Sequence, residues 1–214
     1  MDYNEKLVGE AITAHYETCL EKHKGSLLEV DWTNKEAAIS RYWAFMRHVP
    51  DGIWDGMVLD FGCGTGRLCE YLRFPMRDRR LAYAGCDSSL NMVVEANKKF
   101  GDLHNFFHLP VGQELEWDYD YIVCNGTFTE KRDASWIEMM DYVKSTLSML
   151  LKHTRSTLIV NFMNFHSLPI AKHREEMFFV KLNEVADLCE YLGVKKYTID
   201  ASYLPYEFIV RMDK

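Results

Sequence analysis

Residues 58–68, with the sequence VLDFGCGTGRL, decide the fold of this chain. An apolar run that ends in clustered glycines predicts a buried strand, a tight turn and a helix beyond it. Glycine accepts a positive φ and has no Cβ, so Gly62, Gly64 and Gly66 allow the backbone to approach a ligand closely. A turn that only connects the strand to the helix is the alternative interpretation.

The spacing of the glycines separates the known classes of nucleotide-binding turn. The dinucleotide-binding fingerprint is G-x-G-x-x-G, and Arg67 occupies the position of its third glycine. The phosphate-binding loop G-x-x-x-x-G-K-[ST] is also absent, because Arg67 and Leu68 follow Gly66. The turn therefore disfavours a nicotinamide-dependent oxidoreductase, which remains a minor alternative.

A second apolar strand, residues 81–86, ends in a carboxylate, Asp87. In a doubly wound sheet, the carboxyl ends of the strands face the ligand crevice. An ionised carboxylate has two acceptor oxygens, so Asp87 can accept from both hydroxyls of a ribose. The alternative for Asp87 is a helix N-cap, a role that Ser88 or Ser89 can also fill.

The D-x-G-x-G-x-G pattern at residues 60–66 and the acid of the second strand resemble the class I S-adenosylmethionine-dependent methyltransferases. The resemblance covers about residues 55–212. It implies that S-adenosyl-L-methionine is the cofactor and S-adenosyl-L-homocysteine the product. By the same resemblance, the cofactor contacts the two motifs through Asp60, Gly62, Cys63, Gly64, Gly66, Asp87 and Ser88.

Two further segments are expected to contact the cofactor. After the fourth strand, Asn125 and Gly126 would form a backbone rim beside the sulfonium, with Phe128 as an apolar wall; Asn-Gly is also an ordinary turn signal. Many family members have an acid after the third strand to bind the adenine amine, and this chain has none there. We therefore expect apolar packing on adenine by Leu90, Leu109 and Val111.

Candidates on the N-terminal helices and in the late loop are less specific. Arg41 offers a bidentate fork for the methionyl carboxylate, or it is a surface arginine on a polar helix face. His166 and His173 lie in an irregular segment, and we select His166 as the candidate general base. The aromatic residues Tyr16, Trp32 and Trp43 either belong to the core or line the cofactor site.

The wider sequence alternates between short apolar strands and amphipathic helices. Strands are predicted near 57–61, 81–86, 106–109, 121–124, 158–162, 195–200 and 206–212, and helices near 4–24, 35–48, 66–73, 89–100, 134–152 and 183–192. This pattern predicts one α/β domain over residues 1–214, with a helical cap (about 1–50) before the core (about 55–214). The resemblance implies a doubly wound, Rossmann-like sheet of seven strands, in the order 3-2-1-4-5-7-6 with strand 7 antiparallel.

Composition and charge limit the class of protein. The 214 residues have a net charge of −7 and no long Lys/Arg run, which disfavours tight binding to nucleic acid. The six cysteines form no C-x-x-C pair and no zinc spacing with histidine, so we expect no metal site. Reduced thiols and the lack of a signal peptide predict a cytoplasmic protein, and the apolar runs are too short for a membrane span.

These features predict an S-adenosylmethionine-dependent methyltransferase that acts on a small molecule. The chain is most similar to stand-alone bacterial-type enzymes with a short helical cap and no added substrate domain. A methyltransferase for protein or RNA is the runner-up, and a catalytically silent S-adenosylmethionine-binding subunit is the third hypothesis. The pattern does not specify whether the acceptor atom is O, N or C.

Overall fold

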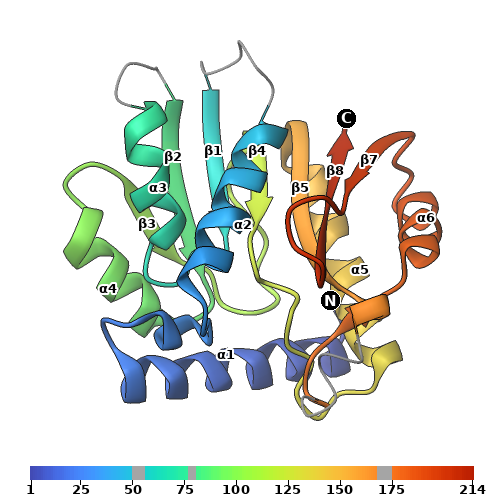
Figure 1. Cartoon of the computed structure of the whole chain (residues 1–214), viewed down its shortest axis with the longest axis horizontal. Coiled ribbons are helices and arrows are strands. Elements are labelled where there is room, and N and C mark those ends of the chain that lie inside the picture. The colour runs from blue at the N-terminus through green and yellow to red at the C-terminus, as the bar shows by residue number, and fades with distance from the viewer. Residues whose placement is uncertain (50–55, 77–80, 168–174) are drawn as a thin grey trace.

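A computed structural model describes residues 1–49, 56–76, 81–167 and 175–214, and shows one sheet with helices on both faces (Figure 1). The strands are β1 (Gly56–Phe61), β2 (Leu81–Asp87), β3 (Asn105–His108), β4 (Tyr119–Cys124), β5 (Thr154–Asn164), β6 (Phe179–Val180), β7 (Lys196–Asp200) and β8 (Glu207–Asp213). The helices are α1 (Tyr3–His23), α2 (Lys35–His48), α3 (Arg67–Met76), α4 (Leu90–Phe100), α5 (Trp136–Lys152) and α6 (Leu182–Tyr191), with short 3₁₀ turns η1 (Leu27–Val30) and η2 (Phe165–Ser167).

The sheet has the strand order β3-β2-β1-β4-β5-β8-β7; β8 runs antiparallel to both of its neighbours, β5 and β7, and the other pairs of described strands are parallel. The predicted order 3-2-1-4-5-7-6 is thereby confirmed, because the two-residue strand β6, which pairs with β5, shifts the numbering of the closing hairpin by one. Two residues are too short to produce a periodic signal in the sequence, so this strand was not predicted.

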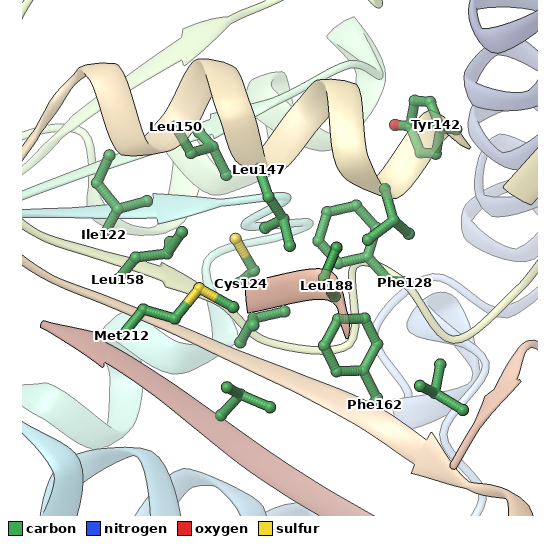
Figure 2. Close-up of a cluster of buried hydrophobic side chains, with 14 of the residues drawn as sticks. Ile122, Cys124, Phe128, Tyr142, Leu147, Leu150, Leu158, Phe162, Leu188 and Met212 are labelled. Carbon is green, nitrogen blue, oxygen red and sulfur yellow. The ribbon is translucent and has the colours of Figure 1, made fainter. Parts of the chain in front are cut away.

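The two faces of the sheet carry two separate hydrophobic clusters. Along β4, Ile122 and Cys124 point into one cluster, whereas Tyr121 and Val123 point into the other. This alternation follows from the two-residue period of a strand, and both faces are apolar because helices cover both. Figure 2 shows the first cluster, in which Ile122 and Cys124 lie beneath Leu147 and Leu150 of α5.

Helix α1 lies across the end of the sheet at which the parallel strands finish (Figure 1). It begins with a capping box between Asp2 and Glu5, and its buried residues Val8 and Ile12 belong to the cluster under α5. This placement covers the crevice in which doubly wound sheets bind ligands. Within the described ranges, no helix combines the length and apolar character needed to cross a membrane.

Candidate active site

The glycine turn after β1 is held tightly against β2. The backbone N–H groups of Gly62 and Cys63 both donate to the carbonyl oxygen of Cys86, at 2.8 and 3.0 Å. Gly62, Gly64 and Gly66 all have a left-handed backbone, with φ of 75°, 53° and 80°. Residues other than glycine rarely adopt this conformation, so the turn requires glycine for its backbone shape.

A first cavity opens above this turn, at the carboxyl ends of β1, β2 and β4. Most of the residues predicted to contact the cofactor line it, namely Asp60, Gly62, Cys63, Gly64, Asp87, Ser88, Leu109, Asn125 and Gly126. Val111 lines it as well. The structure therefore brings together segments that are up to 66 residues apart in the sequence, because parallel strands end at the same edge.

Gly66, which was also predicted to contact the cofactor, does not belong to the lining of this cavity. A Cβ at Gly66 would lie 2.9 Å from the ring of Phe100 and 3.3 Å from that of Phe106. The missing side chain therefore allows α3 to start against two packed aromatic rings. By contrast, a Cβ at Gly62 would lie 2.7 Å from the hydroxyl of Thr127, on the cavity side.

Asp87 is oriented by backbone donors rather than used as a helix cap. One carboxylate oxygen accepts from the N–H of Gly64 at 2.8 Å, and the other accepts from that of Ser89 at 2.9 Å. Ser89 caps α4 through its hydroxyl, which accepts from the N–H of Met92 at 3.2 Å. Each carboxylate oxygen has two lone pairs, so Asp87 can accept two further hydrogen bonds from a ligand in the cavity.

A second carboxyl group, Asp60, lies beneath the turn and is 2% exposed. The hydroxyl of Tyr83 donates to it at 2.6 Å. Burial raises the pKa of Asp60 to about 7, the Tyr83 hydrogen bond opposes this shift, and the charge of Asp87 adds to it. Burial also raises the pKa of Asp87, against its two backbone hydrogen bonds.

Two predicted apolar contacts lie elsewhere in the structure. Leu90 is 53% exposed on the outer side of α4, and Met92, two residues further along, lines the cavity instead. Phe128 is fully buried and stacks on Phe162 in the core, as Figure 2 shows, while Thr127 takes the cavity position. Neither side chain lines the first cavity, because the direction of each depends on tertiary packing.

Arg41 is buried, but it does not reach the first cavity. Its Nε donates to Glu207 Oε2 at 2.7 Å, and its Nη2 donates to Glu207 Oε1. Its guanidinium also stacks over Trp32, 4.1 Å from the ring centroid. Glu207 accepts further hydrogen bonds from Asn161 at 3.1 Å and Tyr203 at 3.2 Å. Arg41 is therefore not a surface arginine. Its guanidinium is also not free to bind the methionyl carboxylate of the cofactor, because the carboxylate of Glu207 already occupies it.

This ion pair lines a second cavity of about 390 Å³. The second cavity shares Tyr16, Val30 and Trp32 with the first, so the two cavities adjoin. Its remaining walls combine acidic, aromatic and thioether side chains, among them Asp31, Glu130, Tyr206, Met163 and Met177. The sequence left open whether Tyr16, Trp32 and Trp43 belong to the core or to the site. Tyr16 and Trp32 lie between the two cavities and line both, whereas Trp43 is 60% exposed.

The candidate base His166 lies outside both cavities. It is exposed on η2, and its backbone N–H donates to Asn164 Oδ1 at 3.1 Å. The alternative base, His173, lies outside the described residues. The structure therefore does not bring His166 to the residues of the glycine turn.

Glu29 is a site-supporting residue that sequence analysis missed. It is fully buried and accepts from the Thr65 hydroxyl at 2.6 Å, the Gly25 N–H at 2.7 Å and Arg67 Nη2 at 2.7 Å. Burial raises its pKa, but these hydrogen bonds and the nearby cations outweigh burial and lower it. Glu29 thereby joins η1 to the glycine turn. A lone acid within the apolar run Leu27–Val30 was the available signal.

One face of α5 was also missed. Tyr142, Thr146 and Met149 line the first cavity, and their spacing of four and three residues places them on one side of a helix. A polar threonine on an otherwise apolar helical face was the signal that could have identified them. Within the described part of the chain, the side-chain oxygen of Asn125 is buried at this cavity without a hydrogen-bond partner.

Comparisons with known proteins agree with this fold. Residues 59–157 match the family model described as a methyltransferase domain. The fold is similar to that of magnesium protoporphyrin IX methyltransferase from Synechocystis PCC 6803, solved with bound SAH, with a TM-score of 0.66, 18% identity and coverage of 97% of this chain and 98% of that one. The fold is also similar to that of the plantazolicin methyltransferase BpumL, solved with a triazolic desmethylPZN analog and SAH. That comparison has a TM-score of 0.68 and 15% identity, and covers 97% of this chain and 96% of that one. An S-adenosylmethionine-dependent methyltransferase from Clostridium acetobutylicum has a TM-score of 0.60 and 13% identity, with coverage of 94% of this chain and 98% of that one. No curated protein matches this chain.

Proposed function

We propose that this chain is a class I S-adenosylmethionine-dependent methyltransferase that transfers the methyl group to a small-molecule acceptor, because residues 59–157 match a methyltransferase domain and the fold is that of methyltransferases solved with SAH. The observation that carries the proposal is the pair of adjoining cavities. One lies at the glycine turn and Asp87, the other at Arg41 and Glu207, and Tyr16 and Trp32 border both. Two adjoining sites are what transfer of a group between two molecules requires.

The residues of the first cavity fit the cofactor chemically. We assign the ribose hydroxyls to Asp87, whose oxygens retain acceptor capacity beyond the N–H groups of Gly64 and Ser89. We assign adenine to the apolar side of the cavity, at Leu109, Val111 and Met92. The buried oxygen of Asn125 is an acceptor suited to the ammonium of the methionyl end.

We place the acceptor in the second cavity. A cavity of about 390 Å³ lies within the usual range for sites that bind small molecules. Trp32 and Tyr206 offer ring surfaces, and Asp31 and Glu130 offer hydrogen-bond acceptors. These groups favour an acceptor that combines an apolar surface with hydrogen-bond donors.

The protein needs few reactive groups for this reaction. S-adenosylmethionine supplies an activated methyl group, so the side chains mainly orient the acceptor and exclude water. A base is required only where the acceptor must lose a proton. Glu130 is a carboxylate of the second cavity that can accept this proton, whereas the position of His166 offers no support for such a role.

The experiment uses S-adenosylmethionine labelled in the methyl group, incubated with the purified protein and separate fractions of metabolites, RNA and protein. We expect label to appear in the metabolite fraction, and to be reduced at low S-adenosylmethionine concentration with Asp87→Ala, which serves as the control for cofactor-dependent transfer. Label confined to RNA or protein would replace our proposal with the macromolecular alternative. No label in any fraction, together with calorimetric binding of S-adenosylhomocysteine, would indicate a silent cofactor-binding subunit instead.

A further inference from the structure

Three side chains with metal-ligating atoms converge at the junction of α1 and η1. They are His15 and Cys19 of α1 and Asp31, the residue that follows η1. His15 Nε2 lies 3.6 Å from Cys19 Sγ and 3.5 Å from Asp31 Oδ2, and all three ligand atoms lie within 4.8 Å of one another. This cluster does not belong to the first cavity.

The backbone holds the three side chains in position before any ion is bound. His15 and Cys19 are four residues apart on a helix of 21 residues, so they project from the same face. Asp31 has a left-handed backbone with φ of 56°, and its N–H donates to the carbonyl oxygen of Leu28 at 3.1 Å. The His15 and Asp31 side chains are 18% and 21% exposed, so an ion from solution can reach them.

The two distances from His15 Nε2 match the edges of a tetrahedral zinc site. With the usual Zn–N, Zn–O and Zn–S bond lengths, two ligand atoms of one tetrahedron lie roughly 3.3–3.6 Å apart. The two distances from His15 Nε2 fall at the upper end of this range. A thiolate, an imidazole and a carboxylate together are the donors that zinc prefers, while magnesium and calcium prefer oxygen donors alone.

We propose that His15, Cys19 and Asp31 bind a divalent ion of the zinc type, with the fourth coordination position open. Asp31 lines the second cavity, so the ion would lie at the wall of that cavity. Three protein ligands and one open position are the arrangement of zinc sites that bind water or a ligand, rather than of closed structural sites. The predicted absence of a metal site considered only cysteine and histidine spacing, and Asp31 joins the pair through the fold.

The experiment measures metal binding directly, so its result does not depend on methyl transfer. The metal-free protein is titrated with Zn²⁺ in competition with a chromophoric chelator. In a second titration Co²⁺ is added, and binding is followed by ultraviolet absorption spectroscopy. We expect one Zn²⁺ per chain and the charge-transfer band of a cobalt–thiolate bond. Cys19→Ser should abolish this band, and His15→Gln and Asp31→Asn should each weaken Zn²⁺ binding by at least about tenfold.

The matched control is His23→Gln, which removes an exposed histidine in the last turn of the same helix and should leave Zn²⁺ affinity unchanged. Thermal unfolding of each metal-free variant verifies that it is folded, and Zn²⁺ should raise the Tm of the wild type but not that of Asp31→Asn. The proposal is overturned if the wild type binds no Zn²⁺, if the cobalt complex lacks the thiolate band, or if all three ligand variants bind Zn²⁺ as the wild type does.

Discussion

The two cavities of this protein are adjacent, but they are built in different ways. The first is built around residues at the carboxyl ends of strands, such as Gly62, Asp87 and Asn125, and helices α1 and α5 complete its walls. The second is formed by the cap, by a loop near Glu130 and by the closing hairpin at Glu207. Parallel strands bring their carboxyl ends to one edge in every member of the fold, whereas cap and hairpin contacts depend on the packing of each chain.

The electrostatics of the two cavities differ in the same way. The first cavity has two acids, the buried Asp60 and the half-buried Asp87, which are held by a tyrosine hydroxyl and by backbone N–H groups respectively. The second has a buried ion pair between Arg41 and Glu207. The first is thus prepared to receive donors from a ligand, whereas the second uses its strongest charges to join the cap to β8.

Breaking the ion pair of the second cavity should have the largest effect on stability. Glu207→Gln leaves the buried guanidinium of Arg41 without a negative partner, which should lower the free energy of unfolding by about 3–5 kcal/mol. Urea denaturation measures this change, and the exposed Glu190→Gln is the control. A loss below about 1 kcal/mol, or an equal loss in the control, would show that the pair does not hold the cap in place.

The first cavity should make stability depend on pH. The folded-state pKa of Asp60 is raised to about 7, so the native state binds an extra proton between about pH 4 and 7 and loses stability as pH rises through that range. Asp60→Asn should abolish this loss, which is about 1.4 kcal/mol per pH unit at most. Denaturation curves at several pH values test the prediction, and parallel pH profiles for the two proteins would contradict it.

Removing the other acid of the first cavity should weaken cofactor binding. Asp87→Ala should lower the affinity for S-adenosylhomocysteine by about 1–3 kcal/mol, because charge-assisted hydrogen bonds are lost. Calorimetry on the folded variant measures this change, with the exposed Asp102→Ala as the control. If affinity is unchanged, Asp87 is not the ribose-binding residue and the division of roles between the cavities has to be redrawn.

The smallest expected effect lies in the link between the two regions. Glu29 and Arg67 join η1 to the glycine turn, and Val30 lines both cavities. A double-mutant cycle with Glu29→Gln and Arg67→Gln should give a coupling energy of about 1 kcal/mol in stability, since Arg67 is partly exposed. Additive effects of the two substitutions would mean that the cap and the turn are stabilised independently.

The success of sequence prediction follows the same division. The sequence predicted that Asp87 and Asn125 share one site, because each directly follows a predicted buried strand. The strand order implied by the family resemblance places the carboxyl ends of these two strands at the same edge of the sheet. Arg41, Leu90 and His166 were misplaced because their positions depend on which way a helix or loop faces. Periodicity identifies a helix and its apolar face, but it does not identify the partner that a polar side chain meets across the fold.

The sequence by itself determined the doubly wound fold and the glycine turn, because three left-handed glycines and a strand-end acid are local requirements of the backbone and of strand polarity. Only the tertiary structure decided that Glu207 neutralises Arg41, that Glu29 holds the glycine turn, and that Asp31 meets His15 and Cys19. Such contacts join residues that are distant in the chain. Their geometry arises only when the cap and the closing hairpin pack on the sheet, so no local pattern encodes them.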